Sequence, residues 1–209
     1  RDPRKPAGSE VRQGESSTGP YGEQQPAPST RPGESQAPTQ GDEKLTAYAF
    51  ESNVWVRVNE EPFTCYRAAG QQKYPYFFPV LGPSTGAPMT EESGEQFPHH
   101  RSLFLGCDRV NGNNYWQDGL ARGQIVSRGP KVESDAADQV VIADRCDWKV
   151  PGASPVIQDD RKYVIRIPRA GWRELDAEIR LTALADIHVA NAVLLDGEWL
   201  AVAQGQISV

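Results

Sequence analysis

The first 44 residues contain no leucine, isoleucine, phenylalanine, methionine or tryptophan, whereas proline, glycine, serine, glutamine and glutamate are frequent there. A segment without these apolar side chains cannot bury enough surface to offset the entropy that a chain loses on folding. We therefore expect residues 1–44 to be a disordered tail or linker and residues 45–209 to be the folded domain.

Long apolar runs are absent as well. The longest, Tyr76–Leu81 and Ala192–Leu195, are much shorter than the roughly 18–20 residues that a membrane-spanning helix needs, so we expect no membrane span. The chain also lacks a basic excess, because its formal net charge is -6. General nucleic-acid binding normally needs a basic face, and we expect no nucleic-acid partner.

Cysteine and histidine are scarce, with three of each in the chain. Cys65, Cys107 and Cys146 lie about 40 residues apart, which fits neither a disulfide framework nor a zinc pattern. We expect three buried thiols, with one disulfide and one free thiol as the alternative. His99, His100 and His188 show no metal-ligand spacing, so the sequence predicts no metal and no cofactor.

From Thr46 onward the pattern is typical of strands. Val54, Val56 and Val58 alternate with Trp55 and Arg57, which predicts a half-buried strand. Turn residues at 59–62 and a strand over 63–66 complete a hairpin. Residues 187–203 fit a strand slightly better than a helix. Further strands are predicted at Tyr76–Val80, Arg101–Gly106, Gly123–Lys131, Gln139–Trp148, Lys162–Ile167 and Ala177–Leu184. Many short strands without a helical apolar stripe predict an all-β, antiparallel β-sandwich or barrel.

The densest group of chemically versatile residues runs from Phe97 to Trp116. His99 and His100 can exchange protons near neutral pH, and Arg101 can hold an oxyanion. Asn111 can pair with hydroxyl groups, and Tyr115 and Trp116 offer flat faces for a sugar ring. This mixture indicates a polyhydroxylated ligand.

A purely structural interpretation of the same residues also holds. Neighbouring residues on a regular strand point to opposite faces, so His99 and His100 could share a site only in an irregular segment, which Pro98 allows. Asn111-Gly112-Asn113 is good turn sequence. The acidic residues between Asp135 and Asp147 read as a solvated face.

Four blocks together resemble a bacterial family named "methane oxygenase PmoA-like", whose function is uncharacterised. They are Lys73–Pro83, Phe97–Leu103, Val110–Trp116 and Arg173–Ala183. The family usually has Asp-His-Pro-His-His where this chain has Gln96-Phe97-Pro98-His99-His100. Its members usually extend further, and the similarity fades after Asp186, so the resemblance implies a truncated or divergent member.

The resemblance implies a galactose-mutarotase-like sandwich in a periplasmic or secreted protein. Our leading hypothesis is a carbohydrate-active enzyme with His99 or His100 as acid or base, Arg101 as oxyanion holder, and Asn111, Tyr115 and Trp116 as substrate-binding residues. One alternative is a non-catalytic glycan-binding or scaffold module. The other is the metal-dependent oxygenase that the family's label implies.

Overall fold

The computed structural model describes residues 43–117, 119–189 and 205–208, all within one compact unit of residues 37–209. The predicted tail lies almost wholly outside the described residues. The first strand begins at Leu45, where the composition changes. Apart from one short 3-10 helix, η1 (Leu120–Arg122), the regular elements of the described part are β-strands. The prediction of an all-β fold is confirmed.

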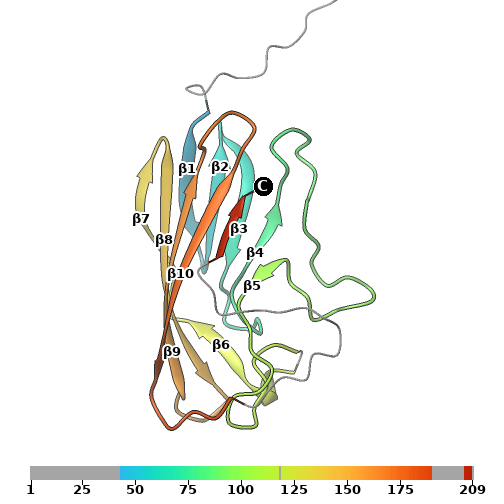
Figure 1. Cartoon of the computed structure of the whole chain (residues 1–209), viewed down its shortest axis with the longest axis vertical. Coiled ribbons are helices and arrows are strands. Elements are labelled where there is room, and N and C mark those ends of the chain that lie inside the picture. Colours follow the sequence, from blue (N-terminus) through green and yellow to red (C-terminus); the bar gives the residue numbers. More distant parts are fainter. Residues whose placement is uncertain (1–42, 118, 190–204, 209) are drawn as a thin grey trace, which may run out of the picture. The chain divides into compact units, whose positions relative to one another are not determined.

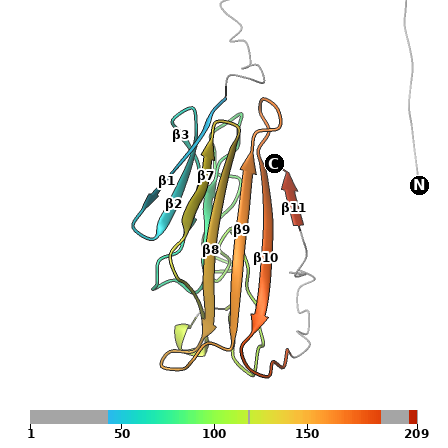
Figure 2. The same cartoon turned by 90° about the vertical axis from the view of Figure 1, so that its left-hand side faces the viewer.

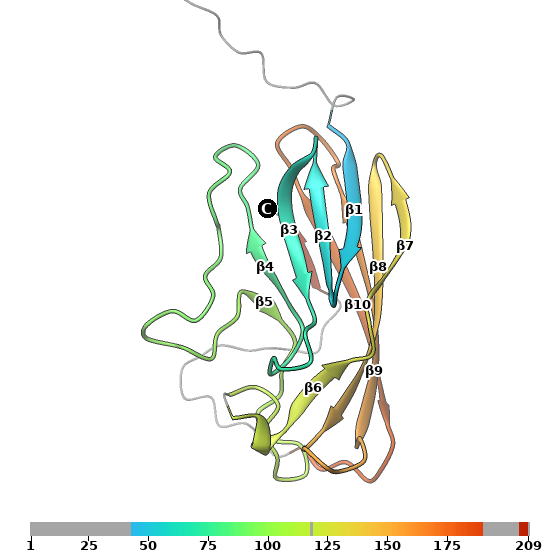
Figure 3. The same cartoon turned by 180° about the vertical axis from the view of Figure 1, so that it is seen from behind.

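The strands form two antiparallel sheets, which face each other in Figures 1 and 3. The first sheet has the order β1-β2-β3-β4-β5 and consists of β1 (Leu45–Phe50), β2 (Asn53–Val58), β3 (Glu61–Arg67), β4 (Tyr76–Val80) and β5 (Leu103–Phe104). The second has the order β11-β10-β9-β8-β6 and consists of β6 (Gln124–Ser127), β7 (Lys131–Ala136), β8 (Gln139–Lys149), β9 (Ile157–Arg166), β10 (Glu174–Ala183) and β11 (Gly205–Ser208). Strand β7 pairs with the first half of β8, and β6 pairs with its last four residues.

The predicted β2–β3 hairpin closes through a tight two-residue turn. Asn59 and Glu60 have φ values of 52° and 69°, and Val58 already pairs with Glu61. Two central residues with positive φ match the right-handed twist of a hairpin, and asparagine tolerates that conformation well.

Apolar side chains from both sheets meet in two core clusters. The first joins β1, β2, β3 and β4 to the N-terminal half of β8, the C-terminal half of β9 and the start of β10. The second joins β4 and the loops after β5 to β6, the end of β8 and the start of β9. The described part is therefore a β-sandwich with a face-to-face core. Its likeness to galactose mutarotase stays a prediction.

A buried polar layer separates the two apolar clusters. Arg161, with no exposed side-chain surface, forms a bidentate ion pair with Asp159 at 2.7 and 2.8 Å. The Trp148 indole N–H donates to the same carboxylate at 2.7 Å. Asp144 on β8 accepts a hydrogen bond of 2.9 Å from the Tyr66 hydroxyl on β3. This last bond links the two sheets directly.

Several strand boundaries differ from the predicted ones. The predicted strand over 123–131 is reduced to β6 and ends before Gly129, whose φ is 108°, while β7 begins only at Lys131. The predicted strand over 101–106 is reduced to Leu103–Phe104. Strand β9 begins five residues before the predicted start. Asp159 and Asp160 are typical of a loop, but both pair with residues of β8. Most of residues 187–203 lies outside the described residues.

We predict that Arg161→Ala lowers the free energy of unfolding by about 3–5 kcal/mol, because it leaves the Asp159 carboxylate buried without its counter-charge. The matched control is Arg145→Ala. It removes an ion pair of the same type, to Asp160 at 2.6 Å, in which both side chains are about half exposed. That change should cost less than about 1 kcal/mol. Urea unfolding measures both, and equal losses would contradict the burial argument.

Alkaline pH should destabilise the fold. Burial raises the pKa of the Cys65 thiol from 9.0 to about 11, although the nearby Arg67 opposes this. Burial also raises the pKa of Cys146 and of Tyr66. Because these groups ionise more readily in the unfolded chain, stability is full below about pH 9 and falls as the pH rises toward about 11. Urea unfolding at several pH values should show this fall, with a shallower slope for Cys65→Ala. If the stability of Cys65→Ala fell with pH as steeply as that of the wild type, the Cys65 thiol would not be a cause of the fall.

Candidate functional site

Four aromatic rings gather where the β4–β5 loop meets the segment after β5. The His100 ring lies parallel to both Phe97 and Trp116, with centroid distances of 4.9 and 6.1 Å and an interplanar angle of 13° in each case. His99 meets Trp116 edge-on at 5.6 Å and His100 at 4.6 Å. The structure therefore brings both predicted histidines together with Trp116.

The histidines can share one site because their segment is a turn rather than a strand. The His100 amide donates to the Phe97 carbonyl at 3.0 Å, and the His100 carbonyl accepts from the Ser93 amide at 2.9 Å. The Tyr74 hydroxyl donates to the His99 carbonyl at 2.6 Å. In Figure 3 the green loop between β4 and β5 extends on the side away from β7 and β8. The segment around Pro98 therefore has the irregular backbone that both histidines need in order to share a site.

An ionic network attaches this loop to the first sheet. Arg67 on β3 donates to both carboxylate oxygens of Glu92 at 3.1 and 3.2 Å. The Tyr76 hydroxyl on β4 donates to the same carboxylate. Burial and the bond to Glu92 raise the pKa of Tyr76, so that this phenol stays protonated and continues to donate. Local sequence pattern does not reveal the role of Glu92, because its partners lie 16 and 25 residues away.

The segment that carries Trp116 is held by a buried lysine. The Lys73 ammonium donates to the carbonyls of Asn114, Gly119 and Gly123 at 2.9, 3.0 and 2.6 Å. Gly123 has a φ of 137°, and a Cβ there would lie 2.7 Å from the Asn114 carbonyl oxygen, so only glycine fits. The Asn114 side chain accepts from the Trp116 amide at 2.9 Å. Trp116 is thus fixed by backbone contacts.

His100 and Phe97 line a hollow of about 350 Å³ in the β4–β5 loop. Its remaining wall carries two hydroxyls, two carboxylates, one amide and one glycine, from Thr90, Ser102, Glu91, Glu95, Gln96 and Gly94. The Ser102 hydroxyl donates to the Thr90 hydroxyl at 2.7 Å. The carboxylates of this hollow accept hydrogen bonds, and its hydroxyls and amide both donate and accept. No lysine or arginine is among its lining residues.

Three predicted site residues have other roles in the structure. Arg101 donates to the Pro98 carbonyl at 3.0 Å and does not line the hollow. Tyr115 has no exposed surface and packs against Trp148 in the second core cluster, with a centroid distance of 5.2 Å. Asn111, with a φ of 50°, forms the predicted turn. Its side chain also donates to the Asp186 carbonyl and accepts from the His188 amide. Asn111 therefore fixes the segment that follows β10.

Neither a metal centre nor a disulfide occurs among the described residues. No group of three or more His, Cys, Asp or Glu side chains there is placed to hold a metal ion. Cys65 and Cys146 are buried free thiols, as predicted, while the free thiol of Cys107 is partly exposed. The described residues include no helix that is long and apolar enough to cross a membrane.

The comparisons with known proteins identify a family but no function. No curated protein and no solved structure matches the chain. A family model described as "Family of unknown function (DUF6807)" matches residues 53–191, from β2 through the segment after β10. That description does not mention methane oxygenase, so the resemblance to the PmoA-like proteins stays a prediction. Since the match covers more than half of the chain, the chain belongs to the DUF6807 family.

Proposed function

We propose that this chain is a carbohydrate-active protein whose sugar site is the hollow at His100. One observation carries the proposal: His100, whose ring lies parallel to those of Phe97 and Trp116, forms part of a hollow whose other groups suit hydroxyls. A chemically active side chain in a fixed orientation beside a polar cavity is the usual arrangement of a binding or catalytic site.

The lining chemistry fits a ligand rich in hydroxyl groups. The hydroxyls of Thr90 and Ser102 and the amide of Gln96 can donate and accept, and the carboxylates of Glu91 and Glu95 accept strongly. A sugar hydroxyl can itself donate and accept, so each of these groups has a complementary partner on the ligand. Phe97, 37% exposed, offers apolar surface for the C–H face of a ring.

His100 is the residue best placed for proton transfer. Phe97 stacks on its ring at 4.9 Å, and the ring edge carries the two nitrogens that a ligand in the hollow would contact. An imidazole exchanges protons near neutral pH. Glu91 or Glu95 in the same hollow would act as the complementary acid or base. His99 meets His100 edge-on at 4.6 Å and acts as a positioning residue.

The resemblance to the PmoA-like family favours a periplasmic or secreted location for this protein. No disulfide supports that location, because the three cysteines are free thiols in the described part of the chain.

Replacing His100 by alanine should abolish turnover and leave the fold intact. Wild-type protein would be assayed against a panel of nitrophenyl glycosides and reducing oligosaccharides, with product release as the readout. Loss of an acid or base catalyst typically reduces the rate about 100- to 10,000-fold. His188→Ala is the matched control, because His188 does not line the hollow, and its turnover should be unchanged.

Two other outcomes would redirect the proposal. Full activity in His100→Ala would refute the catalytic assignment. A sugar-dependent rise in Tm without product, lost in Phe97→Ala but kept in His100→Ala, would identify a non-catalytic glycan-binding module. The exposed Phe97 ring is the observation that favours this second candidate.

A further inference from the structure

A second hollow, of about 570 Å³, lies on the outer face of the second sheet. Figure 2 shows β7, β8, β9 and β10 side by side from this face. Strand register explains the hollow: Ala143 on β8 pairs with Lys131 on β7 and with Lys162 on β9. A methyl group between two long side chains leaves a depression in the sheet surface. Gly129 leaves further space at one edge.

Cations exceed acids around this hollow, although the whole chain is acidic. Asp144 and Arg161 line it but direct their side chains to the interior, where Asp144 bonds Tyr66 and Arg161 bonds Asp159. The remaining charged residues are five cations and three acids: Arg128, Lys131, Arg145, Lys162, Arg180, Glu133, Asp160 and Glu178. At about 0.1 M salt, charges more than about 10 Å away are largely screened, so this local excess decides which ligands are attracted.

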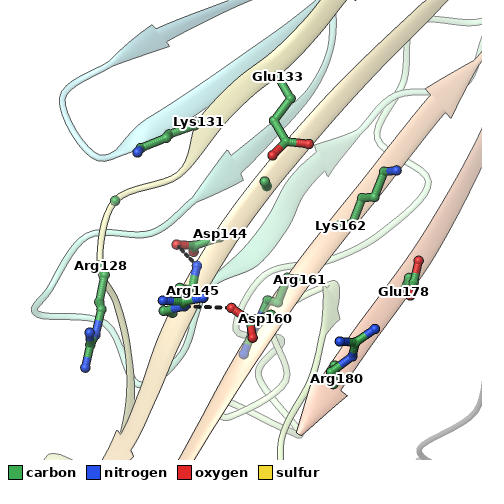
Figure 4. A pocket seen from close by; sticks show the side chains of 12 residues that line it. Arg128, Lys131, Glu133, Asp144, Arg145, Asp160, Arg161, Lys162, Glu178 and Arg180 are labelled. Carbon is green, nitrogen blue, oxygen red and sulfur yellow. Dashed lines mark hydrogen bonds and ion pairs between the residues drawn. The ribbon is translucent and has the colours of Figure 1, made fainter. Parts of the chain in front are cut away.

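Three of the cations are available to a ligand. Arg145 is paired with Asp160 at 2.6 Å, and Arg128 with Asp147 at 2.9 Å. Within the described part of the chain, Lys131, Lys162 and Arg180 make no hydrogen bond or ion pair. Figure 4 shows the three on separate strands around the centre of the hollow. From β7 to β10 the hollow crosses three strand spacings, or about 14 Å.

Two acids at the margin also lack partners in the described part of the chain, namely Glu133 and Glu178. Glu178 stands directly across from Lys162 in the β9–β10 register. A ligand that carried only anionic groups would be repelled by these carboxylates. A ligand that combines anionic groups with hydroxyls can satisfy both sets, because its hydroxyls donate to carboxylates and its anionic groups accept from lysine and arginine.

We propose that this face is a second binding site, for an oligosaccharide that carries carboxylate groups, that is, an oligouronate. Lys131, Lys162 and Arg180 bind its carboxylates, and Glu133 and Glu178 accept hydrogen bonds from its hydroxyls. The ligand lies across β7–β10 with one residue over Ala143. This site shares no lining residue with the hollow at His100, so it does not depend on the function proposed there.

Calorimetric titration with a trimer of galacturonate tests the proposal, with the methyl-esterified trimer as the uncharged probe. At about 0.1 M salt the acid should bind at least about tenfold more tightly than the ester. Lys162→Glu should weaken binding of the acid about tenfold or more by reversing a contact charge. Ala143→Phe should do the same by filling the hollow, without changing any charge.

Lys149→Glu is the matched control, since Lys149 lies on β8 outside the hollow. Its affinity should stay within about twofold of the wild type, because a solvated charge outside the site contributes little. Because Lys162 and Ala143 do not line the hollow at His100, a loss in their variants locates the binding of the trimer on this face. Thermal melting confirms that each variant is folded.

Four results would overturn the proposal. Equal binding of the acid and the ester would remove the role of the cations. An equal loss in Lys149→Glu and Lys162→Glu would indicate nonspecific charge attraction. Full affinity in Ala143→Phe would exclude the hollow. Tighter binding of a sulfated heparin fragment or of single-stranded oligothymidylate would replace the carboxylate sugar by another polyanion.

Discussion

The buried ion pair between Arg161 and Asp159 is the constraint on which the sandwich depends. Two opposite charges without exposed side-chain surface are costly to desolvate unless their geometry is close to ideal. The bidentate contact and the Trp148 N–H satisfy the carboxylate. One guanidinium nitrogen, Nη1, has no partner among the described residues. Any slip of β9 against β8 would break the bond between Trp148 on β8 and Asp159 on β9, so this bond penalises alternative registers.

This fixed register determines what each face of the second sheet presents. Because side chains alternate along a strand, placing Arg161 inside places Asp160 and Lys162 outside. Placing Asp144 inside likewise places Ala143 and Arg145 outside. The charged outer hollow is thus a consequence of the same register that builds the core. The hollow at His100 depends instead on loops that Arg67, Glu92 and Lys73 hold in place.

Much of the fold could be predicted from local pattern. The β4 strand at Tyr76–Val80 was predicted with its observed bounds, and β8 ends one residue after the predicted limit. Strand β4 has β-branched or aromatic residues at four of its five positions, and β8 has the apolar run Val140-Val141-Ile142 directly after its first residue. Strand β7, with the sequence KVESDA, was missed because an edge strand with one solvated face needs few apolar residues. The first half of β9 was missed because Asp159 resembles a loop residue until Arg161 and Trp148 are seen beside it.

The sequence by itself determined the strand-rich fold class, the residue at which the strands begin and the segment that holds the two histidines. These depend on composition and on period-2 alternation, which are local properties. Only the tertiary structure decided which residues share a site. It placed His100, Glu91 and Glu95 in the lining of one hollow, placed Tyr115 in the core, and assigned Asn111 to a turn that holds the segment after β10. The physical reason is that a site forms where loops and strands distant in sequence converge, and a local pattern carries no information about that convergence.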